Sequence, residues 1–237
     1  MENYNGYDLE KIEIGGMEAV IVHPKKPNGK WALKTEYFPA FPGVQLKLLE
    51  LGYYVAHVTS KTRWYCEEDN KRRAELAEYM IKNYGVSEKC VIIGMSCGGM
   101  QGIYFATDYP QYVSVLYLDA PVVNFLSCPA GIGKGRGINY QEFADAKGMS
   151  LEELISFRDH PLDRLPKLAK LNIPVCLVCG DSDGVVPYDE NGIYIKKAYE
   201  EAGAIIETHL KPGCDHHPHS LEDNTPIIDF ILKYDIQ

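Results

Sequence analysis

The sequence lacks long apolar runs and has little positive charge. No apolar run among its 237 residues approaches the roughly 18 residues that a membrane-spanning helix needs. Its 24 Lys and Arg are outnumbered by 33 Asp and Glu, which gives a formal net charge of -9. Nucleic acids and anionic membrane surfaces select for basic faces. We therefore expect neither a nucleic acid nor a membrane as a partner.

Signals for secretion and for a disulfide framework are also missing. The first residues, MENYNGYDLEKIEI, lack the basic and apolar regions of a signal peptide, although a chain trimmed of its leader would begin in the same way. The seven cysteines are an odd number, which favours reduced thiols and a cytoplasmic protein. Cys176 and Cys179 lie three residues apart in an expected strand and so point to opposite faces. We expect both to pack in the core.

Short apolar runs alternate with amphipathic helical patterns along the chain. This alternation predicts one α/β domain over residues 1–237, with a mostly parallel sheet and helices on both faces. The expected strands are 11–14, 17–22, 31–38, 53–58, 90–95, 114–121, 174–181 and 204–211, and the first two form a hairpin. The expected helices are 44–52, 71–85, 98–110, 192–203 and 225–234.

Residues 122–172 interrupt this rhythm with about 50 residues between two expected strands. The segment contains the glycine-rich AGIGKGRG and a helical piece near SLEELISFRDH. An insert of this size, placed after a strand, predicts a small cap over the carboxyl edge of the sheet.

The segment VIIGMSCGGM, residues 91 to 100, places Ser96 between an expected strand and an expected helix. Its GxSxG pattern is typical of a strained strand-to-helix turn that exposes a nucleophilic serine, and the glycines let the two backbones approach. A serine hydroxyl needs a base to take its proton and an acid to orient that base. We therefore looked for both partners at later strand ends.

Candidate acids and bases follow the last two expected strands. Asp181 and Asp183 both lie in CGDSDGVVP, and the spacing from Asp183 to Pro187 favours Asp183, with Asp181 as a turn residue. In KPGCDHHPHSLED, His216 is the first histidine after the Pro-Gly turn and is favoured as the base. His217 and His219, the other two histidines of HHxH, are expected to face substrate or to support the base. HHxH offers ring nitrogens at close spacing, but without HExxH or a cysteine pattern at zinc spacing, Cys214 being alone, we expect no metal site. We also expect no cofactor.

Two backbone donors are needed to stabilise an oxyanion. The N–H of Cys97, directly after the serine, is one candidate, and Tyr37, within the segment 36–38, is the second, although no HGGG-type motif occurs there. Aromatic groups with a polar rim suit a sugar ring, and Lys134 and Arg136 also fit a solvated loop. The candidate substrate-binding residues are Glu36, Trp64, Tyr65, Asn124, Phe125, Lys134, Arg136, Tyr140 and His217.

From about residue 17 to 234 the chain resembles the α/β-hydrolase superfamily, through GMSCGG, GDSDGVVP and GCDHHPHSLEDNTPIIDFI. The last motif is similar to a bacterial branch of esterases and acetyl-xylan-esterase-like hydrolases. Members of that branch commonly carry a bulky or basic residue where this chain has Cys97. The resemblance implies Ser96 as nucleophile, Asp183 as acid and His216 as base, in an enzyme that cleaves carboxylic esters with short acyl groups, including acetyl groups on carbohydrate. Its partner would be a small ester, and a homo-oligomer is compatible with the sequence.

Two other functions fit the same fold. A peptidase of the prolyl-oligopeptidase type shares this catalytic domain, but we expect such an enzyme to carry an N-terminal propeller that gates access. A non-catalytic ligand-binding homologue would be expected to lose a member of the triad, and this chain keeps all three. A dehalogenase would need an aspartate in place of Ser96.

Overall fold

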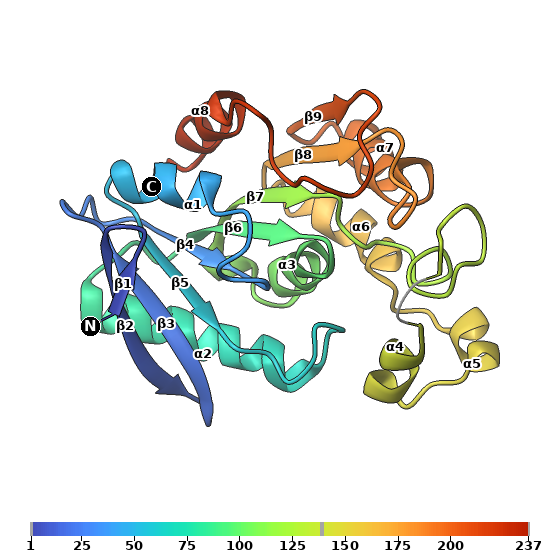
Figure 1. Ribbon diagram of the computed structural model, residues 1–237, viewed down its shortest axis with the longest axis horizontal. Helices are drawn as coiled ribbons and strands as arrows, with labels where there is room; N and C mark the ends of the chain where they lie inside the picture. The colour runs from blue at the N-terminus through green and yellow to red at the C-terminus, as the bar shows by residue number, and fades with distance from the viewer. Residues whose placement is uncertain (1, 138–139, 237) are drawn as a thin grey trace.

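A nine-stranded sheet runs through the chain in the order β1-β2-β3-β5-β4-β6-β7-β8-β9 (Figure 1). The computed structural model describes residues 2–137 and 140–236, so residues 138–139 of the predicted cap and both end residues lie outside it. The six strands β5, β4, β6, β7, β8 and β9, in sheet order, pair in parallel. Strands β1, β2 and β3 form an antiparallel edge, and β3 joins it to β5 in an antiparallel pair. Their bounds are Glu2–Tyr4, Tyr7–Ile14, Met17–His23, Trp31–Lys34, Tyr54–Val58, Cys90–Met95, Val113–Asp119, Val175–Gly180 and Ile206–Lys211.

The predicted hairpin is confirmed as β2 and β3. Ile14 pairs with Met17 across Gly15 and Gly16, which have φ of 54° and 77°. Such positive φ values favour glycine in a tight turn, which is why this dipeptide identified the hairpin. The short edge strand β1 was not predicted, because three residues carry too little periodicity.

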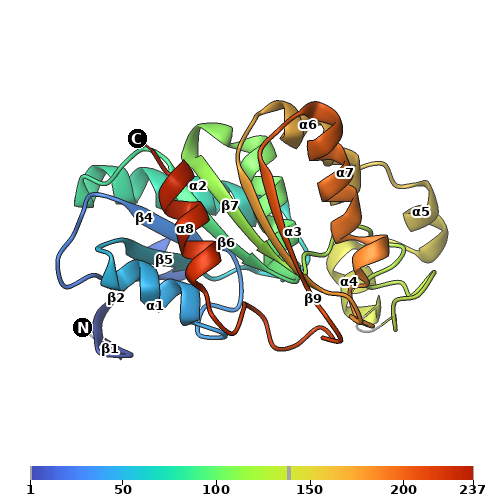
Figure 2. The ribbon, with the colours of Figure 1, turned by 90° about the horizontal axis from the view of Figure 1, so that it is seen from above.

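Helices cover both faces of the sheet, as predicted. Helices α1 and α8 pack on one face, and α2, α3, α6 and α7 on the other (Figure 2). The helices α1 to α8 span Gly43–Glu50, Glu67–Tyr84, Cys97–Asp108, Tyr140–Lys147, Leu151–Ser156, Pro161–Lys170, Gly192–Ala202 and Thr225–Tyr234.

The central strands are buried on both faces, which explains their continuous apolar runs. In β6, Val91 and Ile93 point toward α1 and α8, whereas Ile92 points to the opposite core. Cys176 and Cys179 of β8 likewise lie in different cores, and both are buried. The two thiols therefore pack separately, as the strand geometry required.

Helices α4 and α5 lie beyond the carboxyl ends of β6 and β7 (Figure 1). Their buried residues Phe143 and Leu154 belong to a separate apolar cluster with Trp64 and Phe125. Helix α6 differs, because Leu165 and other residues on its inner side pack in the sheet core against α3 and α7. The last part of the segment 122–172 therefore belongs to the layer that covers the sheet, and only the part before α6 is compatible with the predicted cap.

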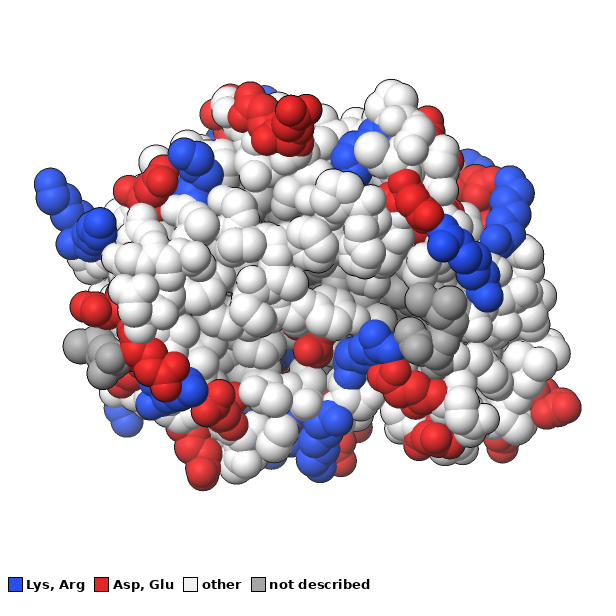
Figure 3. Space-filling model, in the orientation of Figure 1, with Lys and Arg blue, Asp and Glu red and all other residues white. Residues whose placement is uncertain are grey.

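The outer surface carries charges of both signs. On the face drawn in Figure 3, acidic and basic side chains are mixed around the edges and the centre is largely uncharged. Within residues 2–137 and 140–236, no helix is long and apolar enough to cross a membrane.

Candidate active site

Ser96 occupies a strained turn between β6 and α3. Its φ of 53° and ψ of -119° are unusual for a residue with a side chain. The turn is also crowded, since a Cβ at Gly94 would lie 2.8 Å from backbone atoms of the first helical turn. A Cβ at Gly99 would lie 2.5 Å from the Cβ of Pro121. At Gly98, the second glycine of GxSxG, a Cβ would lie 3.1 Å from the Cβ of Glu36. Gly94 and Gly98 of the motif and Gly99 directly after it thus let the chain pack closely enough for the hydroxyl to project from the sheet edge.

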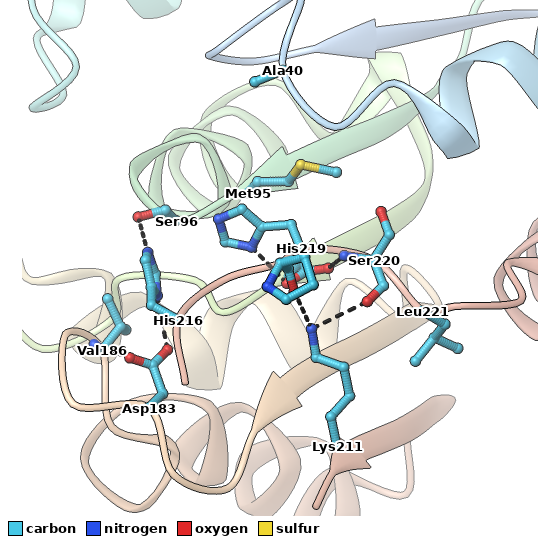
Figure 4. A network of polar contacts seen from close by, with 12 residues as sticks. Ala40, Met95, Ser96, Asp183, Val186, Lys211, His216, His219, Ser220 and Leu221 are labelled. Carbon is cyan, nitrogen blue, oxygen red and sulfur yellow. Dashed lines mark hydrogen bonds and ion pairs between the residues drawn. The ribbon is translucent and has the colours of Figure 1, made fainter. Parts of the chain in front are cut away.

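Ser96, His216 and Asp183 form one chain of hydrogen bonds (Figure 4). The Nε2 of His216 lies 3.1 Å from the Oγ of Ser96, and its Nδ1 lies 2.8 Å from the Oδ2 of Asp183. Asp183 follows β8 and His216 follows β9, so parallel strands bring both to the carboxyl edge where Ser96 projects. The structure thus brings together the three residues that the sequence singled out.

Asp183 is held as a carboxylate. Burial would raise its pKa, but the hydrogen bond and charge of His216 and the N–H groups of Val185 and Val186 lower it instead. Both N–H groups donate to the Oδ1 at 2.8 Å. Asp181, in contrast, is exposed and accepts from the N–H of Gly213 at 2.7 Å, which is the turn role expected of it.

A cavity of about 270 Å³ opens at Ser96. No carboxylate side chain lines it among the residues that the structure describes. Aromatic, imidazole and sulfur-bearing side chains dominate its wall, and Arg63 is its one Lys or Arg within the described chain. The lining comprises Tyr37, Ala40, Phe41, Arg63, Trp64, Met95, Ser96, Cys97, Cys128, Val185, His216, His217 and His219.

Four of the predicted oxyanion and substrate residues line this cavity: Tyr37, Trp64, Cys97 and His217. Cys97 is the first residue of α3, so its N–H has no acceptor within the helix. Burial raises the pKa of its thiol to about 11, which keeps the sulfur protonated near pH 7. Cys97 therefore offers its backbone donor without competing as a nucleophile.

Glu36 and Phe125 do not reach the cavity. The carboxylate of Glu36 accepts from the Nε2 of Gln101 at 2.9 Å, and Glu36 is absent from the cavity lining. Phe125 is fully buried and packs on Phe143 with ring centroids 5.0 Å apart. The two residues therefore support and pack the structure around the site. Their closeness in sequence to predicted site residues did not show whether their side chains reach the cavity.

The two basic candidates for substrate binding, Lys134 and Arg136, form ion pairs outside the cavity. Lys134 forms an exposed ion pair with Asp189, and Arg136 forms one with Asp215. The N–H of Arg136 also donates to the carbonyl of Gly184 at 2.8 Å, so this loop is tied to the loop of Asp183. Neither residue lines the cavity.

The other aromatic and polar candidates also lie outside the lining. Tyr65 stacks on Tyr104, with ring centroids 3.8 Å apart. The Oδ1 of Asn124 accepts from the N–H of Leu126 at 3.1 Å, and Tyr140 packs beside Phe143.

Sequence comparison assigns the chain to a family. The profile of the prolyl oligopeptidase family matches residues 65–234, which include all three triad candidates. The chain belongs to the prolyl oligopeptidase family. It has the α/β-hydrolase fold, and the acetyl-xylan-esterase-like branch stays a prediction. No curated protein matches the sequence significantly.

Solved structures share the fold at low sequence identity. The acylaminoacyl peptidase of Pyrococcus horikoshii matches with a TM-score of 0.73 and 12% identity over 96% of this chain and 42% of that one. A puromycin-hydrolyzing peptidase of Mycobacterium tuberculosis matches at 0.71 and 15% identity over 89% of this chain and 36% of that one. The chain thus spans well under half the length of these peptidases. An α/β hydrolase from a lagoon-sediment metagenome of Mar Chica, Morocco, matches at 0.61 and 15% identity, over 96% and 100% of the two chains.

This member of the prolyl oligopeptidase family carries a second His–Asp pair that sequence reasoning missed. The Nδ1 of His219 lies 2.8 Å from the Oδ1 of Asp119, and the Oδ2 accepts from the hydroxyl of Tyr117 at 2.8 Å and the N–H of Ser220 at 2.5 Å. The backbone oxygen of Asp119 accepts from the N–H of Ser96 at 2.9 Å. Asp119 thereby joins the serine turn to the histidine loop. Its position at the end of a buried apolar strand was the available signal.

Arg63 and Phe41 are further cavity residues that no motif indicated. The Nε of Arg63 donates to Glu142 of α4 at 2.7 Å, which ties the cavity wall to that helix. Phe41 stacks on His217, with ring centroids 5.4 Å apart. Both come from irregular loops, where periodicity carries no information.

Lys34, at the end of β4, is a buried lysine next to the residue that precedes Ser96. It is fully buried, and its Nζ lies 3.1 Å from the Sδ of Met95 and 3.3 Å from the carbonyl of Ala40. Burial lowers its pKa to about 7, against the opposing charge of Asp119. An unfolded lysine has a pKa near 10.4.

Lys34→Met is therefore expected to change how stability depends on pH. Between pH 7 and about 10.4 the unfolded state binds one more proton at Lys34 than the folded state does. The Lys34 contribution to the free energy of unfolding thus rises with pH, by up to about 1.4 kcal/mol per unit. Urea unfolding at pH 7.5 and 9 should show wild type gaining about 1–2 kcal/mol relative to Lys34→Met. Parallel pH dependences would contradict this account.

Proposed function

We propose that this chain hydrolyses small carboxylic esters through an acyl-enzyme on Ser96. The observation that carries the proposal is the Ser96–His216–Asp183 hydrogen-bond chain at the wall of a small cavity. A nucleophile, its base and the group that orients the base lie within hydrogen-bond reach of one another, which is the arrangement that acyl transfer needs.

The proposed reaction has two steps. His216 takes the proton of Ser96 through Nε2 as the Oγ attacks the ester carbonyl, and Asp183 holds the ring and balances its positive charge. The N–H of Cys97 and a donor from Tyr37 bind the oxyanion. His216 then protonates the leaving alcohol. Water, deprotonated by the same histidine, attacks the acyl group and releases the acid.

The size and lining of the cavity favour a substrate with a small, uncharged acyl group. The cavity volume of about 270 Å³ lies just below the roughly 300–1,000 Å³ typical of ligand pockets. Tyr37, Phe41 and Trp64 provide apolar wall, and no described carboxylate lines it to bind a free ammonium group. Lys134 and Arg136, the polar candidates for binding a sugar, are paired with acids outside the cavity, so acetylated carbohydrate is the less supported ester class.

Peptide hydrolysis is the second candidate, and the family match favours it. Without a described carboxylate in the lining, the cavity suits a blocked or acylated amino terminus better than a free one. A substrate such as an N-acetylated amino acid amide would combine a small neutral acyl group with the family's peptidase chemistry.

A panel of chromogenic substrates tests both functions. We expect wild type to cleave p-nitrophenyl acetate faster than p-nitrophenyl octanoate, and N-acetyl-alanine p-nitroanilide faster than unblocked alanine p-nitroanilide. Ser96→Ala, purified in the same way, should lose all of these activities. Amide turnover comparable to ester turnover would favour the peptidase, and hydrolysis that survives Ser96→Ala would contradict both functions.

A further inference from the structure

Three histidines of the loop after β9 meet at one wall of the cavity. His216, His217 and His219 each offer a ring nitrogen, and these atoms lie within 4.8 Å of one another. Their ring centroids are 4.8–4.9 Å apart in every pairing. All three rings line the cavity at Ser96. The cluster is therefore accessible to a small ion that enters with solvent.

Two of the rings are oriented as metal ligands are. The Nδ1 of His216 faces Asp183 and the Nδ1 of His219 faces Asp119, each at 2.8 Å, and both carboxylates are buried. A carboxylate on one ring nitrogen fixes the tautomer and leaves the Nε2 lone pair available, which is how metal-binding histidines are usually supported. The HHxH spacing alone did not predict that carboxylates orient these rings, because the motif contains neither Asp119 nor its contact with His219.

The third ring is free to adjust. Zn–N bonds of about 2.0–2.1 Å in a tetrahedral site place the nitrogens roughly 3.3 Å apart. The buried rings of His216 and His219 are held by their carboxylates, whereas His217 is exposed and stacks on Phe41. Because no two of the ligand nitrogens are more than 4.8 Å apart, each separation needs to shorten by at most about 1.5 Å, and the exposed His217 ring can move most. The fourth position would then face the cavity and hold water.

We propose that His216, His217 and His219 bind a first-row divalent ion of the zinc type, and that the bound ion reversibly inhibits the hydrolase. Three imidazoles suit Zn²⁺, Cu²⁺ or Ni²⁺ and not Mg²⁺ or Ca²⁺. Coordination occupies the Nε2 lone pair of His216, so this nitrogen no longer accepts the proton of Ser96. The inhibition, but not the binding, rests on the proposed function.

Binding is tested without any reaction, by titrating Zn²⁺ into the Ser96→Ala protein in a calorimeter. We expect one ion per chain, and at least tenfold weaker binding once His217→Ala is added to the same background. His23→Ala is the matched control, because His23 lies on β3 and pairs with Glu10 away from the cavity, and it should leave Zn²⁺ affinity unchanged. Absence of binding, or equal affinity with and without His217, would overturn the site.

Inhibition is tested on the wild type with p-nitrophenyl acetate in buffer free of chelators. Zn²⁺ should abolish hydrolysis, EDTA should restore it and Mg²⁺ should have no effect. His217→Ala, normalised to its own metal-free rate, should need at least tenfold more Zn²⁺ for half inhibition. Activation by Zn²⁺, or equal sensitivity of the two proteins, would overturn the inhibitory role. If neither protein hydrolyses the ester, the proposed function fails, and the calorimetry alone still decides the metal site.

Discussion

Ser96→Ala, His216→Ala and the double variant are expected to lose ester hydrolysis to nearly the same extent, on the order of 10⁵- to 10⁶-fold in kcat. The serine hydroxyl is a weak nucleophile without its base, and the base has no proton to take without the serine. The two side chains are hydrogen-bonded at 3.1 Å and act as one unit, so their effects should not add. Steady-state kinetics on the best ester of the substrate panel provides the comparison.

The two neighbouring aspartates supply the control for this prediction. Asp183→Asn should lower kcat by roughly 10⁴-fold, because the amide favours the wrong tautomer of His216. Asp181→Asn, on the same loop, should leave kcat within a few-fold of wild type, since its carboxylate contacts the Gly213 N–H and not the histidine. Equal losses in the two variants, or a double variant far worse than either single one, would contradict the proposed triad.

Much of the fold could be predicted from the sequence, because its strands are buried on both faces. Continuous apolar runs such as residues 90–95 have no other stable environment, and the strand β6 has those bounds. The prediction was weaker where tertiary contacts decide the structure. The expected strand 31–38 ends at Lys34, because the chain then turns through Tyr37, whose φ is 54°. Likewise α6 packs on the sheet core, although it follows the cap in sequence.

The candidate triad was predictable because each member follows a strand of the same parallel sheet. Such strand ends converge at one edge whatever the length of chain between them, and Ser96, Asp183 and His216 all follow this rule. The cavity wall was less predictable. Phe41 and Arg63 enter from loops whose paths are set by packing, and Lys134 and Arg136 found acidic partners that no local pattern identifies.

Asp119→Ala is expected to destabilise the protein by about 3–5 kcal/mol at pH 7. The carboxylate is fully buried and accepts from Tyr117, His219 and Ser220. Its removal leaves the buried His219 ring nitrogen and Ser220 N–H without this acceptor, and leaves the Tyr117 hydroxyl only the Oγ of Ser220, at 3.2 Å. Burial alone would raise the pKa of Asp119, but the hydrogen bond and charge of His219 lower it. A lowered folded-state pKa means that this contribution is present at neutral pH and is lost as pH falls through the folded pKa.

Urea unfolding at pH 7 measures this loss, and Asp229→Ala on the exposed side of α8 is a matched substitution expected to stay within about 0.5 kcal/mol of wild type. Asp119→Asn keeps the shape and one acceptor oxygen, so it should lose less stability than Asp119→Ala.

Both variants should also lower kcat more than they raise KM, because Asp119 holds Ser220 and His219 in the loop that presents His216, and its backbone oxygen holds the Ser96 N–H. A variant that is destabilised yet keeps its kcat, when assayed well below its unfolding midpoint, would restrict Asp119 to folding. A variant that keeps its stability would show that water replaces the buried carboxylate and that the second His–Asp pair does not hold the histidine loop.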